Sequence, residues 1–375
     1  MPIYPNPDLV AESGHLECWN KPGQRRKSFH NLHRLTRYGF SLRASKVLGL
    51  ISEPDPRIAQ LPSVKHLTQL SVFSALVVLR GEHNVHEQYA VDFSADQAHS
   101  IMSITKTMTH LIMGRCISEG LVDPSRSVRE YLPGIGTGYA DAVVQDVLDM
   151  NIVNSYSEDY SDSDTTALRH NASLGWRLPP PGESEMPNRE FLCKIRGDTL
   201  ANFSGLVNYK SANTDVLAWI AELVTGRSLK EHFIEIIEAA GIEDTFYMST
   251  DCTGVPNTNG GACMSALDLA RYGLVFSRKG RGVTGETIGS WSFIEAARRC
   301  RGPTYPPPDN HIHYGNQLKT NGRWIGHSGW GGQLLLIDPE TSTVVVFFSV
   351  LENESASDDA HSRAIVRMAE DIIEL

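Results

Sequence analysis

The sequence predicts an α/β (α+β) fold in which an antiparallel sheet is flanked by helices and interrupted by a mostly helical insertion. Strand-like apolar runs lie near both ends of the chain, and the middle carries helical patterns. Since a sheet must bury a face against another layer, strands from the two ends are expected to pair around the inserted middle. The 375 residues are 41% hydrophobic and 21% charged, which is typical of a globular protein with a large core.

The first strands follow a polar start. The first 60 residues carry many polar and basic side chains and predict an irregular arm with one short helix. Its basic run at 24–27 predicts a solvated or internally paired face. Residues 72–79 and 85–91 are strand-like apolar runs on either side of a turn. We divide the chain into an N-terminal arm, a sheet domain and a helical domain, at residues 1–60, 61–130 with 255–375, and 131–254.

A largely buried helix is predicted at 103–118, because its apolar side chains cover a broad face and only one Lys and one Arg within it are charged. Gly120 follows in the position that commonly ends a helix. A shorter amphipathic helix is predicted at 141–150. Residues 154–190 contain an acidic segment and then three consecutive prolines, and so long a loop predicts a lid or a binding loop.

The second half of the chain shows helical patterns first, strand patterns after them and one more helix at the end. Helical patterns cover 214–225, 228–240, 266–276, 286–299 and, at the end of the chain, 356–373. Strand patterns separated by turn residues cover 312–318, 324–327, 333–337 and 343–351. These four strands predict an antiparallel meander.

Composition excludes several classes of function. With 34 Lys+Arg against 44 Asp+Glu, the formal charge is −10, which argues against nucleic acid or an anionic membrane surface as a partner. No stretch has the roughly 18 apolar residues that a membrane helix needs, and the first ten residues do not resemble a secretory signal. The six cysteines form no C-x-x-C pair, so we expect free thiols, no structural zinc site and a cytoplasmic protein. We also expect no cofactor.

Ser103 and Lys106 are the strongest candidates for catalysis. Residues three apart share a helix face, so the Lys106 amine can lie beside the Ser103 hydroxyl. A buried lysine has a lowered pKa and can take the proton of a hydroxyl nucleophile. Backbone N–H groups at the helix start favour a developing oxyanion. The alternative is that Ser103 caps the helix and Lys106 points into solvent.

Two further segments are candidates for the same chemistry. Tyr209 lies beside Lys210 just before the helix at 214–225, where a nearby ammonium could lower the phenol pKa enough for it to act as a base or to relay a proton. A packing role is the alternative. Residues 326–332 (GHSGWGG) form a glycine-rich strand end that lets a ligand approach the backbone closely, or only a tight turn.

Taken in order, these motifs resemble the penicillin-recognising serine hydrolase superfamily, with its Ser-x-x-Lys, Tyr-x-Ser/Asn and late Lys/His-Ser/Thr-Gly. The chain is more closely similar to the class C β-lactamase-like esterases and amidases, of the 6-aminohexanoate-dimer hydrolase type. The supporting segments are 99–106, 209–215, 259–261, 327–333 and, for the N-terminal arm, 19–31. The resemblance spans nearly the whole chain and implies a β-lactamase/transpeptidase-like fold.

The resemblance implies roles for individual residues. Ser103 would be the acyl-accepting nucleophile, with Lys106 and Tyr209 sharing the base and acid duties. The backbone N–H groups of Ser103 and Trp330 would form the oxyanion hole. The substrate-binding residues would be Tyr160, with Tyr156 as second choice for the lid tyrosine, together with Ser211, His327, Ser328, Gly329, Trp176 and Asn259. Trp176 is equally compatible with a core position.

Two positions depart from the pattern of β-lactamases. Ser211 stands where many relatives carry Asn, and His327 stands where they carry Lys. A histidine is mostly neutral at pH 7, so the cation that would hold a β-lactam carboxylate is replaced. Both departures favour simple esters or linear amides over penicillins. The acidic residues of the lid segment could attract a substrate amine or be a solvated loop: Glu158, Asp159, Asp162 and Asp164.

The sequence therefore predicts a metal-free serine hydrolase that cleaves small esters or linear amides through an acyl-enzyme on Ser103. The alternatives are a β-lactamase or D-amino-acid peptidase, and a catalytically silent ligand-binding relative. The expected partner is a small-molecule ester or amide, with no nucleic acid and no membrane. A homodimer is compatible with the sequence.

Overall fold

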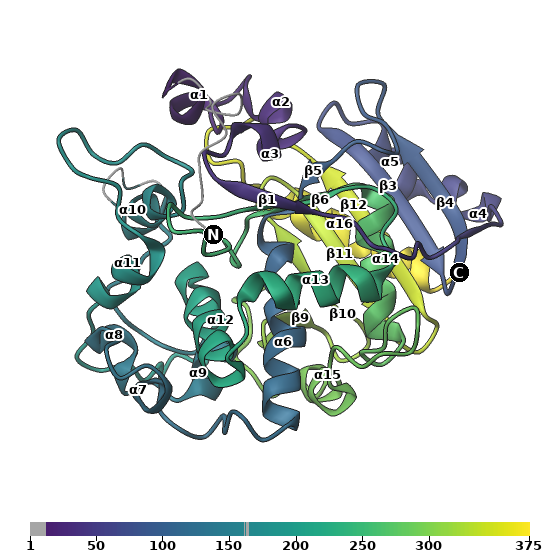
Figure 1. The fold of residues 1–375 in the computed structure, drawn as a ribbon. Coiled ribbons are helices and arrows are strands. Elements are labelled where there is room, and N and C mark those ends of the chain that lie inside the picture. The colour runs from purple at the N-terminus through teal and green to yellow at the C-terminus, as the bar shows by residue number, and fades with distance from the viewer. Residues whose placement is uncertain (1–12, 161, 163–164) are drawn as a thin grey trace.

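The computed structural model describes residues 13–160, 162 and 165–375 (Figure 1). Its centre is an eight-stranded sheet in which only β2 and β4 are parallel. The strand order is β2 (Ile51–Ser52), β4 (His83–Tyr89), β3 (Phe73–Arg80), β12 (Thr343–Ser349), β11 (Gln333–Asp338), β10 (Ile325–Gly329), β9 (Leu318–Thr320) and β8 (His313–Gly315).

Strands β3 and β12 join the two ends of the chain, as the sequence predicts. They pair antiparallel, with Val78 opposite Val345. Both are mostly apolar and buried along nearly their whole length, because both faces of the sheet are covered. Successive side chains point to opposite faces, so Val77 packs into the core on one side and Val78 into the core on the other. The second core lies under α16 (Asp359–Ile373) and α5 (Pro62–Thr68).

The helical half packs around α6 (Lys106–Ser118), which follows the short 3₁₀ helix η2 (Met102–Thr105). Helix α12 (Ser211–Thr225) lies directly against α6. Gly226, in the left-handed conformation, ends α12, and a capping box between Ser228 and Glu231 starts the next helix. This half also contains α7 (Val128–Tyr131), α8 (Thr137–Ala140), α9 (Val144–Leu148) and α13 (Leu229–Ala240). Helix α14 (Ala266–Ser277) packs on β3, β11 and β12 of the central sheet, and α15 (Trp291–Arg298) contacts β9.

A second, four-stranded sheet places the start of η2. Its order is β1 (Gly39–Leu42), β6 (Phe246–Ser249), β7 (Ala262–Met264) and β5 (His99–Ser100). Strand β5 pairs with β7 and leads within two residues into η2. Strand β1 is not predicted from the sequence, because a four-residue strand with an alternating half-buried pattern depends on its distant partner β6.

The arm and the predicted lid are more ordered than expected. The arm carries α1 (Ser13–Cys18), α2 (Arg25–Phe29), α3 (Leu32–Leu35), β1, β2 and α4 (Pro56–Gln60). The segment 154–190 contains the helix α10 (Thr166–Ser173) and runs into α11 (Asn188–Lys194), so a pure loop is wrong there. The helix is not predicted because the buried face of α10 consists of Ala167, His170 and Ser173, which form no apolar pattern in the sequence. Across the described ranges, no helix is long and apolar enough to cross a membrane.

The basic run of the arm is internally paired, one of the two predicted outcomes. The buried Arg25 guanidinium donates to the carbonyls of Leu351 and Asn353 at 2.6 and 2.7 Å. Arg26 forms an ion pair with Asp92 at 2.7 Å. The Arg25 contacts fasten the arm to the segment that follows β12.

Candidate active site

Ser103 lies on a tight turn between β5 and α6. Met102, immediately before it, has φ of 47°, a left-handed conformation that is costly for a residue with a side chain. The Thr105 hydroxyl donates to the Met102 carbonyl at 2.7 Å and holds this turn. Ser103 is thereby presented in the first turn of η2, where backbone N–H groups have no acceptor within the helix.

Lys106 is buried directly beneath Ser103. Its Nζ donates to Ser103 Oγ at 2.9 Å, to Ser211 Oγ at 3.1 Å and to the Asn259 carbonyl at 2.6 Å. The side chain is 0% exposed, and burial lowers its pKa from 10.5 to about 8. All three acceptors are neutral oxygens. The amine is therefore placed to take the Ser103 proton, and the alternative of a lysine pointing into solvent is wrong.

The ring of Tyr209 faces the Lys106 amine. Its ring centroid lies 5.1 Å from Lys106 Nζ. Within the described part of the chain its buried hydroxyl has no complete hydrogen bond, although Ser103 is near enough to act on its pKa. Burial raises the pKa of Tyr209 well above 10, and Ser103 opposes this only in part. The expectation of a lowered phenol pKa is wrong. The geometry favours a neutral phenol that can donate or relay a proton.

His327 on β10 is buried and neutral. Its Nδ1 lies 2.7 Å from the Ser328 carbonyl and its Nε2 lies 3.2 Å from the Tyr314 hydroxyl. We infer that Nδ1 carries the proton and that Nε2 accepts from the phenol. Burial and the charges of Lys319 and Lys106 lower the pKa of His327 well below 6.5.

Lys319 supplies the cation that His327 does not. It lies on β9, where it pairs with Gly326 of β10. Its Nζ donates to Ser328 Oγ at 3.2 Å and lies 4.8 Å from the centroid of the Tyr305 ring. Burial lowers its pKa to about 8, so it is mostly charged at pH 7. The interpretation that the histidine removes the cation from this wall is wrong, because the neighbouring strand provides one.

A buried network holds the residues around Lys106. Asp215 of α12 accepts from Asn259 Nδ2 at 2.7 Å and from the Thr258 hydroxyl at 2.6 Å, and it lies 3.0 Å from His170 Nε2. Burial alone would raise the pKa of Asp215, but its contacts with His170, Thr258 and Asn259 lower it overall. The His170 ring also lies 3.0 Å from the Tyr156 hydroxyl. The network therefore fixes the loop whose Asn259 carbonyl accepts from Lys106.

The predicted site residues meet in one cavity of about 280 Å³. Ser103, Tyr209 and every predicted substrate-binding residue line it, and these are Tyr156, Tyr160, Trp176, Ser211, Asn259, His327, Ser328 and Gly329. Trp330 lines it too. Lys106 lies beneath the floor. Three further residues belong to the site and were not predicted from the sequence: Lys319 and His170, which also line the cavity, and Asp215 behind it.

The lid tyrosines differ in their surroundings. The Tyr160 ring stacks on Trp330 at 5.9 Å between centroids and stays 43% exposed, as a residue over a cleft would. Tyr156 is 3% exposed and uses its hydroxyl in the buried network. Trp176 combines the two predicted positions. It lines the cavity, and its buried Nε1 donates to Ser249 Oγ at 3.0 Å. Of the four acidic lid residues, Glu158 lines the cavity and Asp164 lies outside the described residues.

A family model described as Beta-lactamase matches residues 68–369. The chain belongs to the Beta-lactamase family. Over 362 residues it is 33% identical to the 6-aminohexanoate-dimer hydrolase of Paenarthrobacter ureafaciens, covering 92% of this chain and 90% of that one. This Beta-lactamase family member is accordingly a serine hydrolase, and the predicted family, fold class and enzyme type are confirmed.

Solved structures share the fold of this Beta-lactamase family member. A Bacillus anthracis protein provisionally named a 6-aminohexanoate-dimer hydrolase matches with a TM-score of 0.81 and 22% identity, over 98% of this chain and 97% of that one. The D-stereospecific amidohydrolase of Streptomyces sp. matches with a TM-score of 0.59 and 17% identity, over 83% and 98% of the two chains. At these identities the two matches show a common fold.

Proposed function

We propose that this hydrolase cleaves linear amides, and small esters, through an acyl-enzyme on Ser103. The observation that carries the proposal is the 2.9 Å contact between Ser103 Oγ and the buried Lys106 Nζ. A serine hydroxyl needs a base within hydrogen-bond reach, and a lysine whose pKa is lowered to about 8 is partly neutral at pH 7.

In the proposed acylation step, the Lys106 amine takes the hydroxyl proton while Ser103 Oγ attacks the carbonyl carbon. The carbonyl oxygen becomes an oxyanion that accepts from the backbone N–H groups of Ser103 and Trp330. Ser103 lies in the first turn of η2, and Trp330 comes just after the last β10–β11 pair, Gly329–Gln333, so both N–H groups lie outside regular ladders. Donors fixed in advance stabilise this charge without reorganisation.

Tyr209 is proposed to protonate the leaving group. Its neutral phenol has no complete hydrogen bond to the described residues, lines the cavity and lies beside Lys106. The scissile C–N or C–O bond breaks, the amine or alcohol departs with the Tyr209 proton, and the acyl group stays on Ser103. Lys106 then passes the Ser103 proton to the Tyr209 phenolate, which restores both groups. In deacylation a water gives a proton to the neutral Lys106 amine and attacks the acyl carbon. The bond between the acyl carbon and Ser103 Oγ breaks, Oγ takes that proton back from Lys106, and the acid is released.

The choice of a linear amide rests on the relative and on the walls of the cavity. The Paenarthrobacter relative is named for the dimer of 6-aminohexanoate, a linear amide. Glu158 lines the cavity, and its carboxylate accepts from the backbone N–H of Ser211. We propose that Glu158 attracts the amino end of such a substrate.

The test compares matched substrates with purified protein. We expect Ser103-dependent turnover of a linear aminohexanoate amide and of short p-nitrophenyl esters, with much lower kcat/KM for nitrocefin. Ser103→Ala should remove this turnover while the fold, measured by circular dichroism, is kept. Fast nitrocefin hydrolysis would instead support a β-lactamase, and the absence of any Ser103-dependent turnover would support a silent ligand-binding relative. A homodimer and a cytoplasmic location stay predictions, which light scattering and cell fractionation test.

A further inference from the structure

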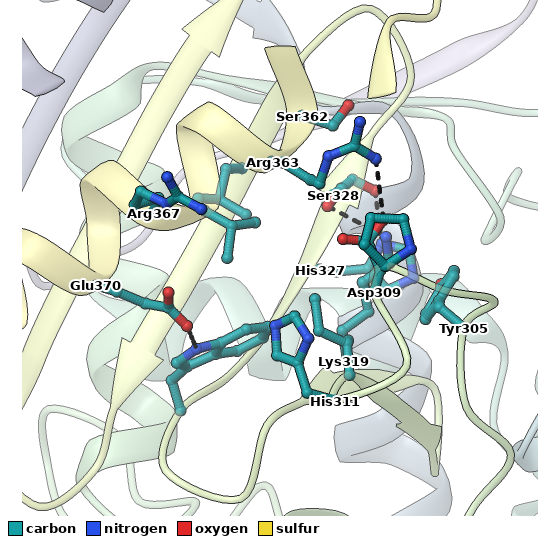
Figure 2. A pocket seen from close by; sticks show the side chains of 15 residues that line it. Tyr305, Asp309, His311, Lys319, His327, Ser328, Ser362, Arg363, Arg367 and Glu370 are labelled. Atoms are coloured by element: carbon teal, nitrogen blue, oxygen red, sulfur yellow. Dashed lines mark hydrogen bonds and ion pairs between the residues drawn. The ribbon is translucent and has the colours of Figure 1, made fainter. Parts of the chain in front are cut away.

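A second cavity lies directly beside the active-site cavity. Its volume is about 340 Å³, and it shares four lining residues with the first cavity: Tyr305, Lys319, His327 and Ser328. Figure 2 shows these four residues close to Asp309, with Arg363, Arg367 and Glu370 reaching the same space from α16. The two cavities adjoin at these four residues, so a substrate long enough to pass Ser328 would enter the second.

The second cavity combines an apolar lining with cations. Its apolar side chains are Ile312, Trp324, Leu334 and Val366. Both of its carboxylates are engaged: Asp309 pairs with Arg363 at 3.4 Å, and Glu370 accepts from Trp324 Nε1 at 2.8 Å. Apolar walls accommodate a methylene chain of the ligand. The charged side chains that form no ion pair determine which terminal group of that chain can bind.

Two of the cations form no direct ion pair with a described residue, although the charge of Asp309 raises the pKa of Lys319 and so offsets part of the effect of burial. Lys319 Nζ contacts a hydroxyl and an aromatic ring, and Arg367 is exposed at the cavity edge. For the residues that the structure places, neither side chain forms an ion pair. An ammonium group has three hydrogen-bond donors. When the group is partly withdrawn from water, a charged acceptor forms the strongest hydrogen bond with it. The cavity therefore suits a chain that ends in a carboxylate.

We propose that the second cavity binds the carboxylate end of an elongated substrate, with Lys319 as its main anchor and Arg367 adding attraction at the rim. This inference rests on the proposed function, because it names the far end of a substrate cut at Ser103. Together with Glu158 at the first cavity, it specifies a substrate that carries an amine at one end and a carboxylate at the other. Methylene groups between them would lie along Leu334 and Val366.

The test compares two linear aminohexanoate amides that differ only at the end, one a carboxylate and the other a carboxamide. At pH 7 the wild type should prefer the carboxylate in kcat/KM by about ten- to a hundredfold, the range for a hydrogen bond to a charged group. Lys319→Met should reduce the ratio to about one, mainly by raising KM. Lys230→Met, which changes an exposed lysine of α13, is the control and should keep the wild-type ratio.

A steric variant and a binding assay separate this inference from the proposed function. Val366→Trp should fill the second cavity and lower the same ratio without removing any charge. Adipate should bind to Ser103→Ala in a calorimeter, and binding should weaken at least tenfold when Lys319→Met is added. This readout needs no turnover. Equal ratios in the wild type and Lys319→Met, or equal adipate binding with and without Lys319, would overturn the subsite even if Ser103 is catalytic.

Discussion

The ionisation of Lys106 predicts the pH dependence of the enzyme. Burial lowers its pKa from 10.5 to about 8. At pH 7 roughly one molecule in ten then has a neutral amine, against roughly one in three thousand for an unperturbed lysine. The gain is about 300-fold, or about 3 kcal/mol. For a neutral p-nitrophenyl ester, kcat/KM should rise about tenfold between pH 7 and pH 9 and then level off.

Two variants should move this inflection in opposite directions. The charge of Lys319 lowers the pKa of Lys106, so Lys319→Met should shift the inflection to higher pH. The charge of Glu158 raises it, so Glu158→Gln should shift the inflection to lower pH. Lys230→Met serves as the control. A flat profile between pH 7 and 9 would refute the reasoning, and so would an inflection that vanishes in Lys319→Met, because it would then belong to Lys319.

Three further predictions follow from the same geometry. Because the folded pKa of Lys106 lies below its unfolded value, the wild type should gain about 2–3 kcal/mol of stability relative to Lys106→Met between pH 7 and pH 10, measured by urea unfolding at both pH values. Tyr209→Phe should lower kcat by about 10²–10⁴-fold while the Tm stays within a few degrees, because its hydroxyl gives up no complete hydrogen bond; a drop of tenfold or less would argue against a proton-transfer role. Asp215→Asn should lower kcat more than it raises KM, because Asp215 orders Asn259. It should also shift the inflection of the pH profile to lower pH, because the charge of Asp215 raises the pKa of Lys106. An unchanged pH profile would contradict this.

Much of the fold follows from local sequence pattern. The apolar runs that become β3 and β12 are long and doubly buried, so they stand out without knowledge of their partners. The helix predicted at 103–118 ends at the same residue as α6, although its first turn is the 3₁₀ helix η2, which carries Ser103. Strand β1 and helix α10 are missed because tertiary contacts, not their own composition, decide their conformation.

The site shows the same division between local and distant information. Ser103 and Lys106 are three residues apart, so helical geometry alone brings their side chains together. Lys319 reaches Ser328 only through the register of β9 against β10, which the amino-acid pattern does not specify. His170 and Asp215 are 45 positions apart, on α10 and α12, and meet only in the folded chain. Burial also reverses the expected pKa shift of Tyr209, and burial is not visible in a motif.

The acyl-enzyme on Ser103 is the central claim, and mass spectrometry after rapid acid quench tests it most directly. With a p-nitrophenyl ester of a bulky acid that deacylates slowly, the intact protein should gain one acyl group. Digestion should place that group on the peptide containing Ser103, and Ser103→Ala should gain none. Acyl transfer to another residue, or full hydrolytic activity in Ser103→Ala, would contradict the account.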